Sequence, residues 1–199
     1  MPLNCMLANR GMTVIGVDPD AASLELAQAK PGAHLVRWVH GDISAVPSGT
    51  RVDVVTMTAH VAQVFLTDED WHLTLERAFT ALRPGGRIVF ETRDPSQRAW
   101  RKWTKDKTRS RADVPGLGVV EGSVETTMVD GPFVTFGGEY TFHRGGVVLT
   151  PRETTLRFRS RDEVTASLRT AGFVFEGVRD APDRPGKEFV FIALRPHSS

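Results

Sequence analysis

The chain has 199 residues, of which 40% are hydrophobic and 25% are charged, a composition typical of a globular protein that buries one core. Its formal net charge of +1 gives no electrostatic reason to expect binding to nucleic acid or to a membrane surface. The single Cys5 excludes an internal disulfide and a metal site built on thiolates. Because no apolar run approaches the roughly 18 residues of a membrane span and no signal-like segment opens the chain, we expect a cytoplasmic protein.

Short β-branched apolar runs alternate with helical patterns along most of the chain, which predicts βα units around a parallel sheet. The first helix is expected to begin at Pro19 and to stop before Pro31. The predicted strands are 13–17, 35–39, 52–57, 87–92, 173–178 and 188–194.

Two later helices open with residues at capping-box spacing. Thr67 and Asp70 precede an apolar stripe and predict a helix over 68–83. Ser160 and Glu163 stand at the same spacing and predict a third helix.

The order of the last elements predicts the topology. Only nine residues, 179–187, separate the last two strands, and a parallel crossover needs a dozen or more, so these strands are expected to form an antiparallel hairpin. Between 119 and 158 the pattern changes to alternation with turn signals, which predicts an antiparallel β insertion that covers the active crevice as a lid. We therefore expect a doubly wound α/β domain formed by 1–118 and 159–199, with the insertion over 119–158.

Several segments carry a resemblance to a known family. They are "GVDPD", "VRWVHGDISAVP", "VDVVTMTAHVAQVF", "LRPGGRIVFETRDP" and the terminal helix and hairpin. In this order they resemble class I S-adenosylmethionine-dependent methyltransferases, especially small-molecule enzymes with a β-rich insertion. The resemblance implies a Rossmann-like α/β fold, S-adenosylmethionine as the cofactor, and methyl transfer to a small-molecule acceptor.

The chain departs from that family at its start. In the family, the first strand ends in an acidic, glycine-rich loop that holds the methionine end of the cofactor. Here no Gly-x-Gly precedes Thr13, and "MPLNCMLANRG" resembles only the later part of the helix after that loop. We therefore expect a chain that lacks this strand and loop by truncation and binds the cofactor less tightly.

Two acids, Asp18 and Asp42, close predicted strands. Ligands of open α/β sheets lie beyond the carboxyl ends of the strands, so Asp18 is expected to accept hydrogen bonds from both ribose hydroxyls of a nucleoside. The resemblance adds Pro19 to the cofactor site and implies that Asp42 and Ile43 bracket the adenine. In the alternative interpretations, Asp18 caps the helix beginning at Pro19 and Asp42 is a turn residue.

A second group of candidates follows the third and fourth predicted strands. The resemblance implies that Met57 and Thr58 face the methyl-bearing sulfonium. His60 is a candidate for taking a proton from the acceptor, with a polar loop histidine as the alternative. Glu91 and Arg93 are candidates for contact with the substrate, with a salt-bridged surface pair as the alternative.

The basic segment 98–111 surrounds Trp100 and Trp103 and is suited to recruit an anionic substrate or single-stranded nucleic acid. The favoured alternative is a solvated helix with both tryptophans packed beneath it. The remaining histidines have no metal-ligand spacing, so no metal is predicted.

Two other functions compete with methyl transfer. One is a non-catalytic, methyltransferase-like protein that binds a partner or forms a homodimer through strand edges left unpaired by the truncation. The other is a nicotinamide-dependent dehydrogenase, which the terminal hairpin and the lack of a GxGxxG motif disfavour. The sequence predicts neither the acceptor nor the methylated atom.

Overall fold

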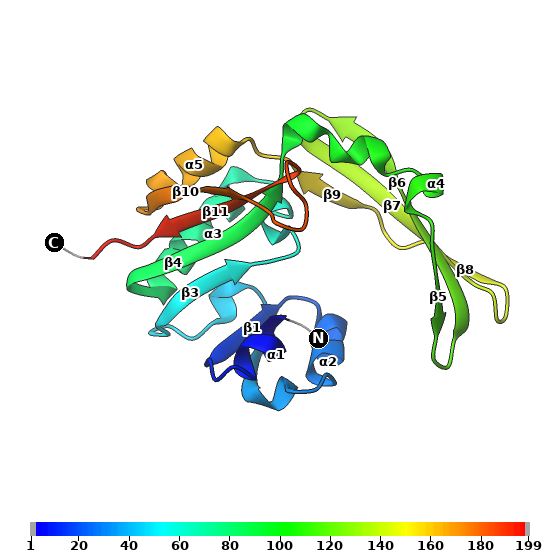
Figure 1. Ribbon diagram of the computed structural model, residues 1–199, viewed down its shortest axis with the longest axis horizontal. Coiled ribbons are helices and arrows are strands. Elements are labelled where there is room, and N and C mark those ends of the chain that lie inside the picture. Colours follow the sequence, from blue (N-terminus) through cyan, green and yellow to red (C-terminus); the bar gives the residue numbers. More distant parts are fainter. Residues whose placement is uncertain (1–2, 198–199) are drawn as a thin grey trace. The chain divides into compact units, whose positions relative to one another are not determined.

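The computed structural model describes residues 3–197 and contains two compact units that divide between Val52 and Asp53. The first unit is a βαβ element (Figure 1). Its strands β1 and β2 are parallel, with Val14 opposite Val36 and Asp18 opposite His40. The elements are α1 (Leu3–Ala8), β1 (Val14–Asp18), α2 (Ala21–Gln28), η1 (Ala33–Leu35), β2 (Val36–His40) and η2 (Ile43–Ala45).

A small core holds the first unit together. It consists of Cys5, Ala8, Ala33 and Val36, with Val14 and Trp38 packed against it. A side chain on Gly16 would lie 2.5 Å from the Trp38 ring, so the close approach of β1 to this indole requires a glycine.

The helix after β1 begins two residues later than predicted. Asp20 is its N-cap, with Oδ2 accepting the Ser23 N–H at 3.0 Å and the Ser23 hydroxyl at 2.6 Å. Pro19 therefore precedes the helix. Asp18 instead accepts the Asp20 N–H at 2.9 Å, so the interpretation of Asp18 as the helix cap is wrong.

The second unit contains a four-stranded sheet in the order β10-β11-β4-β3. β10 and β11 form the predicted antiparallel hairpin, and β11 also pairs antiparallel with β4, with Glu188 opposite Arg93. The strands are β3 (Val52–Met57), β4 (Leu82–Arg93), β10 (Val174–Asp180) and β11 (Glu188–Leu194). β4 begins five residues before the predicted position because Arg195 exchanges backbone hydrogen bonds with Gly85 and Gly86 and so continues the ladder.

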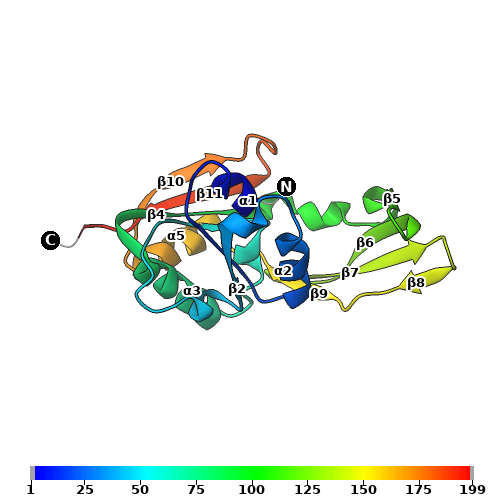
Figure 2. The same cartoon turned by 90° about the horizontal axis from the view of Figure 1, so that it is seen from below.

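Helices α3 (Asp68–Ala81) and α5 (Arg161–Thr170) lie on one face of this sheet (Figures 1 and 2). Both begin as predicted. Thr67 Oγ1 accepts the Asp70 N–H at 3.1 Å, and Ser160 and Glu163 form a complete capping box. The buried aromatic residues of the interface include Trp71 against Phe90, which in turn stacks on Phe191.

The predicted β insertion is an antiparallel sheet in the order β5-β6-β7-β8, with β9 also paired to β7. It begins at Ser110, earlier than the expected 119, and Figure 1 shows its β5 and β8 end extending away from the four-stranded sheet. The elements from β4 to α5 are η4 (Pro95–Gln97), η5 (Ala99–Lys102), α4 (Lys105–Thr108), β5 (Ser110–Val114), β6 (Gly118–Asp130), β7 (Phe133–Phe142), β8 (Val147–Leu149) and β9 (Thr154–Arg157).

Candidate active site

In the first unit, the two acids predicted to bind a nucleoside follow neighbouring parallel strands. Asp18 is the last residue of β1, and its second carboxylate oxygen accepts no hydrogen bond from the residues that the structure describes. Asp42 comes two residues after β2 and caps η2 by accepting the Ser44 N–H at 2.8 Å. Ile43 is the first residue of η2 and is half-buried. Asp42 therefore does have the turn role of the alternative interpretation, whereas Asp18 keeps acceptor capacity that suits a ribose diol.

In the second unit, β3 ends at the buried Met57 and continues through the exposed Thr58 into a strained turn. Ala59 and His60 both have left-handed backbone angles, with φ of 57° and 61°. Such angles are costly for residues with a Cβ atom and persist where the surrounding structure holds them. The turn leads into η3 (Val61–Gln63), whose Gln63 is buried.

Glu91 and Arg93 stand at the carboxyl end of β4, but no ion pair joins them within residues 3–197. Glu91 Oε1 accepts the N–H of Ala59 at 2.8 Å. The Arg93 guanidinium donates to Gln63 Oε1 at 3.0 Å and lies over the Trp103 ring, 5.3 Å from its centroid. The interpretation of these two residues as a surface salt bridge is therefore wrong.

His60 is 5% exposed and has a carboxylate partner that the sequence did not reveal. Its Nε2 lies 2.8 Å from Glu188 Oε1, a contact that does not have hydrogen-bond geometry, and no described residue forms a hydrogen bond with this nitrogen. The same Glu188 oxygen accepts a hydrogen bond from Arg184 at 2.7 Å. Thus β3, β4 and β11 bring a histidine, two carboxylates and two guanidinium groups to one edge of the sheet.

Burial and the nearby Arg93 charge hold the pKa of His60 below its ordinary value, although Glu188 acts in the opposite direction. Burial raises the pKa of Glu188, but the hydrogen bond from Arg184 and the close contact with His60 outweigh it, so the pKa is lowered overall. At neutral pH the pair is therefore a neutral imidazole facing a carboxylate.

Glu188, Arg184 and Gln63 are the residues of this cluster that the sequence reasoning missed. The available signal was the predicted hairpin, because an antiparallel last strand beginning at Glu188 can start beside the carboxyl end of the strand carrying Glu91 and Arg93. That inference also requires the strand order, which local patterns do not contain.

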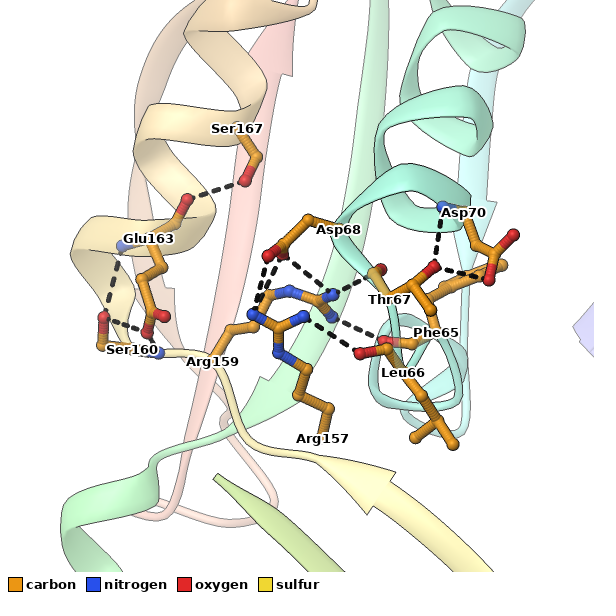
Figure 3. Close-up of polar contacts among 10 residues, drawn as sticks. All are labelled: Phe65, Leu66, Thr67, Asp68, Asp70, Arg157, Arg159, Ser160, Glu163 and Ser167. Carbon is orange, nitrogen blue, oxygen red and sulfur yellow. Dashed lines mark hydrogen bonds and ion pairs between the residues drawn. The ribbon is translucent and has the colours of Figure 1, made fainter. Parts of the chain in front are cut away.

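A pair of arginines anchors the loop that follows η3 (Figure 3). Arg159 is 4% exposed and donates to the carbonyl oxygens of Phe65 at 2.8 Å and Thr67 at 2.9 Å. Arg157, at the end of β9, donates to Leu66 O and to Asp68 Oδ2, each at 3.0 Å. Because Arg157 belongs to β9 and Arg159 precedes α5, they join the end of the β insertion to the loop between η3 and α3.

The basic segment 98–111 has its aromatic residues turned inward. Trp100 and Trp103 pack against Phe158, with ring centroids 4.6 Å and 6.2 Å away, and Trp103 also contacts Phe136 at 5.2 Å. Most of the cationic side chains of the segment are exposed. The packed tryptophans agree with the favoured alternative, but its single helix is wrong, because the segment consists of η5, α4 and the start of β5.

Residues 3–86, from α1 to the start of β4, match a protein family described as a methyltransferase domain. No curated protein sequence matches the chain. None of the helices within residues 3–197 is long and apolar enough to cross a membrane.

Among solved structures, the chain is similar to an S-adenosylmethionine-dependent methyltransferase from Clostridium acetobutylicum, with a TM-score of 0.71 and 14% identity over 94% of this chain and 76% of that one. It is also similar to the CcbJ methyltransferase from Streptomyces caelestis, with a TM-score of 0.71 and 19% identity over 96% and 78% of the two chains. A third is CalS10, an amino pentose methyltransferase from Micromonospora echinaspora, with a TM-score of 0.68 and 20% identity over 95% and 76%. The resemblance seen in the sequence is thus confirmed: residues 3–86 match a methyltransferase domain, and the chain has the fold of the class I S-adenosylmethionine-dependent methyltransferases.

Proposed function

We propose that this protein transfers a methyl group from S-adenosylmethionine to a small-molecule acceptor. The family match over residues 3–86 supports the reaction, and the S-adenosylmethionine-bound amino pentose methyltransferase among the similar structures supports both the cofactor and an acceptor of small size. The observation that carries the proposal is the position of Asp18, at the carboxyl end of a parallel strand and with acceptor capacity for a ribose diol.

The first unit would bind the nucleoside part of the cofactor. Asp18 would accept hydrogen bonds from the two ribose hydroxyls, with Pro19 beside it, and Asp42 and Ile43 would bracket the adenine. The bound cofactor supplies an electrophilic methyl group on a sulfonium centre.

The second unit would bind the acceptor and take up the proton that the acceptor loses. Met57 and Thr58 would face the methyl group, and Glu91 and Arg93 would contact the acceptor. His60, neutral at pH 7, would receive the proton that the acceptor atom loses. Methyl transfer also depends on orientation and on exclusion of water, so the insertion over 119–158 would act as a lid that selects the acceptor.

The test has a binding arm and a reaction arm. Calorimetric titration of the whole chain with S-adenosylmethionine should detect binding, and incubation with a panel of small amines, alcohols and amino sugars should release S-adenosylhomocysteine with at least one of them. The variant Asp18→Asn should reduce both the binding of S-adenosylmethionine and the release of S-adenosylhomocysteine. Neither binding nor product from the wild-type protein would refute the proposal.

A second candidate function is self-association without catalysis, as a cytoplasmic homodimer. Edge strand β8 exposes three consecutive apolar residues, Val147, Val148 and Leu149, each about half exposed. Apolar edge strands invite pairing with another strand. Sedimentation should then show a dimer that Val148→Lys converts to a monomer, and a wild-type monomer would exclude this candidate.

A further inference from the structure

Glu188 occupies a position in the candidate site that its place in the sequence does not suggest. It is the first residue of β11, it is 7% exposed, and among the described residues it has the only carboxylate oxygen within 4 Å of a His60 ring nitrogen. Since β11 is antiparallel to β4, Glu188 lies opposite Arg93 at the edge where β3 and β4 end. The final strand of the fold therefore supplies a charge to the turn after β3.

We propose that Glu188 is a positioning residue that holds the His60 imidazole in the tautomer with its proton on Nε2. The pair lacks hydrogen-bond geometry, but an ionised carboxylate has no proton of its own, so a contact at 2.8 Å favours a proton on the nitrogen that faces it. The other ring nitrogen, Nδ1, is then an unprotonated acceptor. This inference rests on the proposed function only in giving Nδ1 its role as the proton acceptor.

The groups around the pair keep both members in the required protonation state. Arg184 donates to the same Glu188 oxygen at 2.7 Å and stabilises the carboxylate. Arg93, from β4, disfavours a second positive charge on His60, whereas Glu91 and Glu188 favour one. Because burial acts in the same direction as Arg93, the imidazole stays neutral and retains an acceptor nitrogen.

Glu188 would assist the transfer of a proton from the methyl acceptor to His60. As the acceptor atom forms its bond to the methyl carbon, the bond from that carbon to sulfur breaks and its electron pair stays on sulfur. The proton of the acceptor atom, a nitrogen or an oxygen, passes to Nδ1 of His60. Glu188 then stabilises the resulting imidazolium from the Nε2 side until the proton leaves to water. A carboxylate that orients a histidine base has the same role in catalytic triads.

The decisive measurement is the tautomer of His60 in the folded wild-type protein, which needs neither cofactor nor acceptor. Histidine labelled with nitrogen-15 reports the tautomer through long-range correlations between ring nitrogens and ring protons, and His60→Gln identifies the His60 signals. Above pH 7 we expect Nε2 to carry the proton and Nδ1 to be bare. A proton on Nδ1, or an even mixture of tautomers, would overturn the proposal.

Two matched variants separate positioning from general stability. Glu188→Gln offers an amide that can donate to Nε2, so the tautomer preference of His60 should be lost and its pKa should fall. Glu176→Gln is the control, because it removes a carboxylate from another arginine–glutamate pair, formed by Arg87 of β4 and Glu176 of β10. It should leave the His60 signals unchanged. Unchanged His60 signals in folded Glu188→Gln would also overturn the proposal.

Kinetics extend the test with an acceptor found in the reaction panel. Glu188→Gln should lower kcat by at least about tenfold with a smaller change in KM, because the acceptor is still bound but Nδ1 is no longer kept unprotonated and the imidazolium loses its carboxylate. An unaltered kcat would count against the proposal. If the wild-type protein transfers no methyl group at all, the proposed function fails, and the tautomer measurement still decides the role of Glu188.

Discussion

Glu91 Oε1 accepts the backbone N–H of Ala59 at 2.8 Å and thereby joins the end of β4 to the strained turn that follows β3. The bond crosses 32 residues of sequence and binds the first of two consecutive residues with positive φ. The orientation of His60 thus depends on a side chain from another strand.

Removing this acceptor should destabilise the turn. Glu91→Ala leaves the Ala59 N–H without its partner and should lower the free energy of unfolding by about 1 to 2 kcal/mol. Glu91→Gln keeps an acceptor oxygen and should cost less than half as much. Urea unfolding measures both, with the exposed Glu153→Ala as a control expected to change stability by less than about 0.5 kcal/mol. Equal stability of Glu91→Ala and wild type would contradict this role.

Asp18 and Asp20 should separate cofactor binding from helix capping. Asp18→Asn removes a charged acceptor from the ribose site and should weaken binding of S-adenosylmethionine by about 1 to 3 kcal/mol, without lowering the melting temperature much. Asp20→Ala removes the N-cap of α2 and should lower the melting temperature while leaving the affinity unchanged. Calorimetry and thermal unfolding of both variants provide the comparison. If Asp18→Asn bound the cofactor as tightly as wild type, the ribose role would be wrong.

Arg159 should matter far more to stability than its partner Asp68. Arg159→Met keeps much of the side-chain volume but leaves Phe65 O without its donor and Thr67 O with only the long hydrogen bond from Trp71 N–H at 3.4 Å, at a cost of about 2 kcal/mol or more. Asp68 is 77% exposed, so water screens its ion pairs and Asp68→Asn should cost less than about 1 kcal/mol. Denaturant unfolding of the two variants measures the loss in the free energy of unfolding. A larger loss for Asp68→Asn than for Arg159→Met would contradict this prediction.

The lowered pKa of His60 predicts a dependence of stability on pH. Between the folded pKa and the ordinary value of 6.5, the unfolded chain binds a proton that folded His60 does not, so the free energy of unfolding rises with pH. Stability is therefore lost as the pH falls through this window. Unfolding measured from about pH 5 to about pH 7.5 should show this slope in the wild type and a smaller one in His60→Gln. If both proteins showed the same slope, titratable groups other than His60 would be responsible for it.

Local sequence patterns determined most of the secondary structure. The Ser160 and Glu163 capping box and the Thr67 cap depend on residues three positions apart, and both are present. The strands at 52–57 and 188–194 have the predicted bounds. The short 179–187 connection excluded a parallel crossover on length alone, and the antiparallel hairpin is confirmed.

Where two local signals competed, the sequence did not distinguish between them. Pro19 and Asp20 are both suitable near a helix start, and the hydrogen bonds of Ser23 to Asp20 decided the start at Ala21. Likewise, the helix was predicted over 68–83 and the next strand over 87–92, but α3 ends at Ala81 and β4 begins at Leu82, with Gly85 and Gly86 paired to Arg195.

The sequence by itself therefore determined the α/β class, the terminal hairpin and the candidates Asp18, His60, Glu91 and Arg93, because acids and polar residues after apolar strands are visible in one dimension. Only the tertiary structure decided that Glu188 faces His60 across 128 positions of sequence. The physical reason is that side-chain partners across a sheet are set by strand order and register. These in turn depend on how the apolar faces of α3, α5 and the sheet pack together, and no short stretch of sequence encodes that packing.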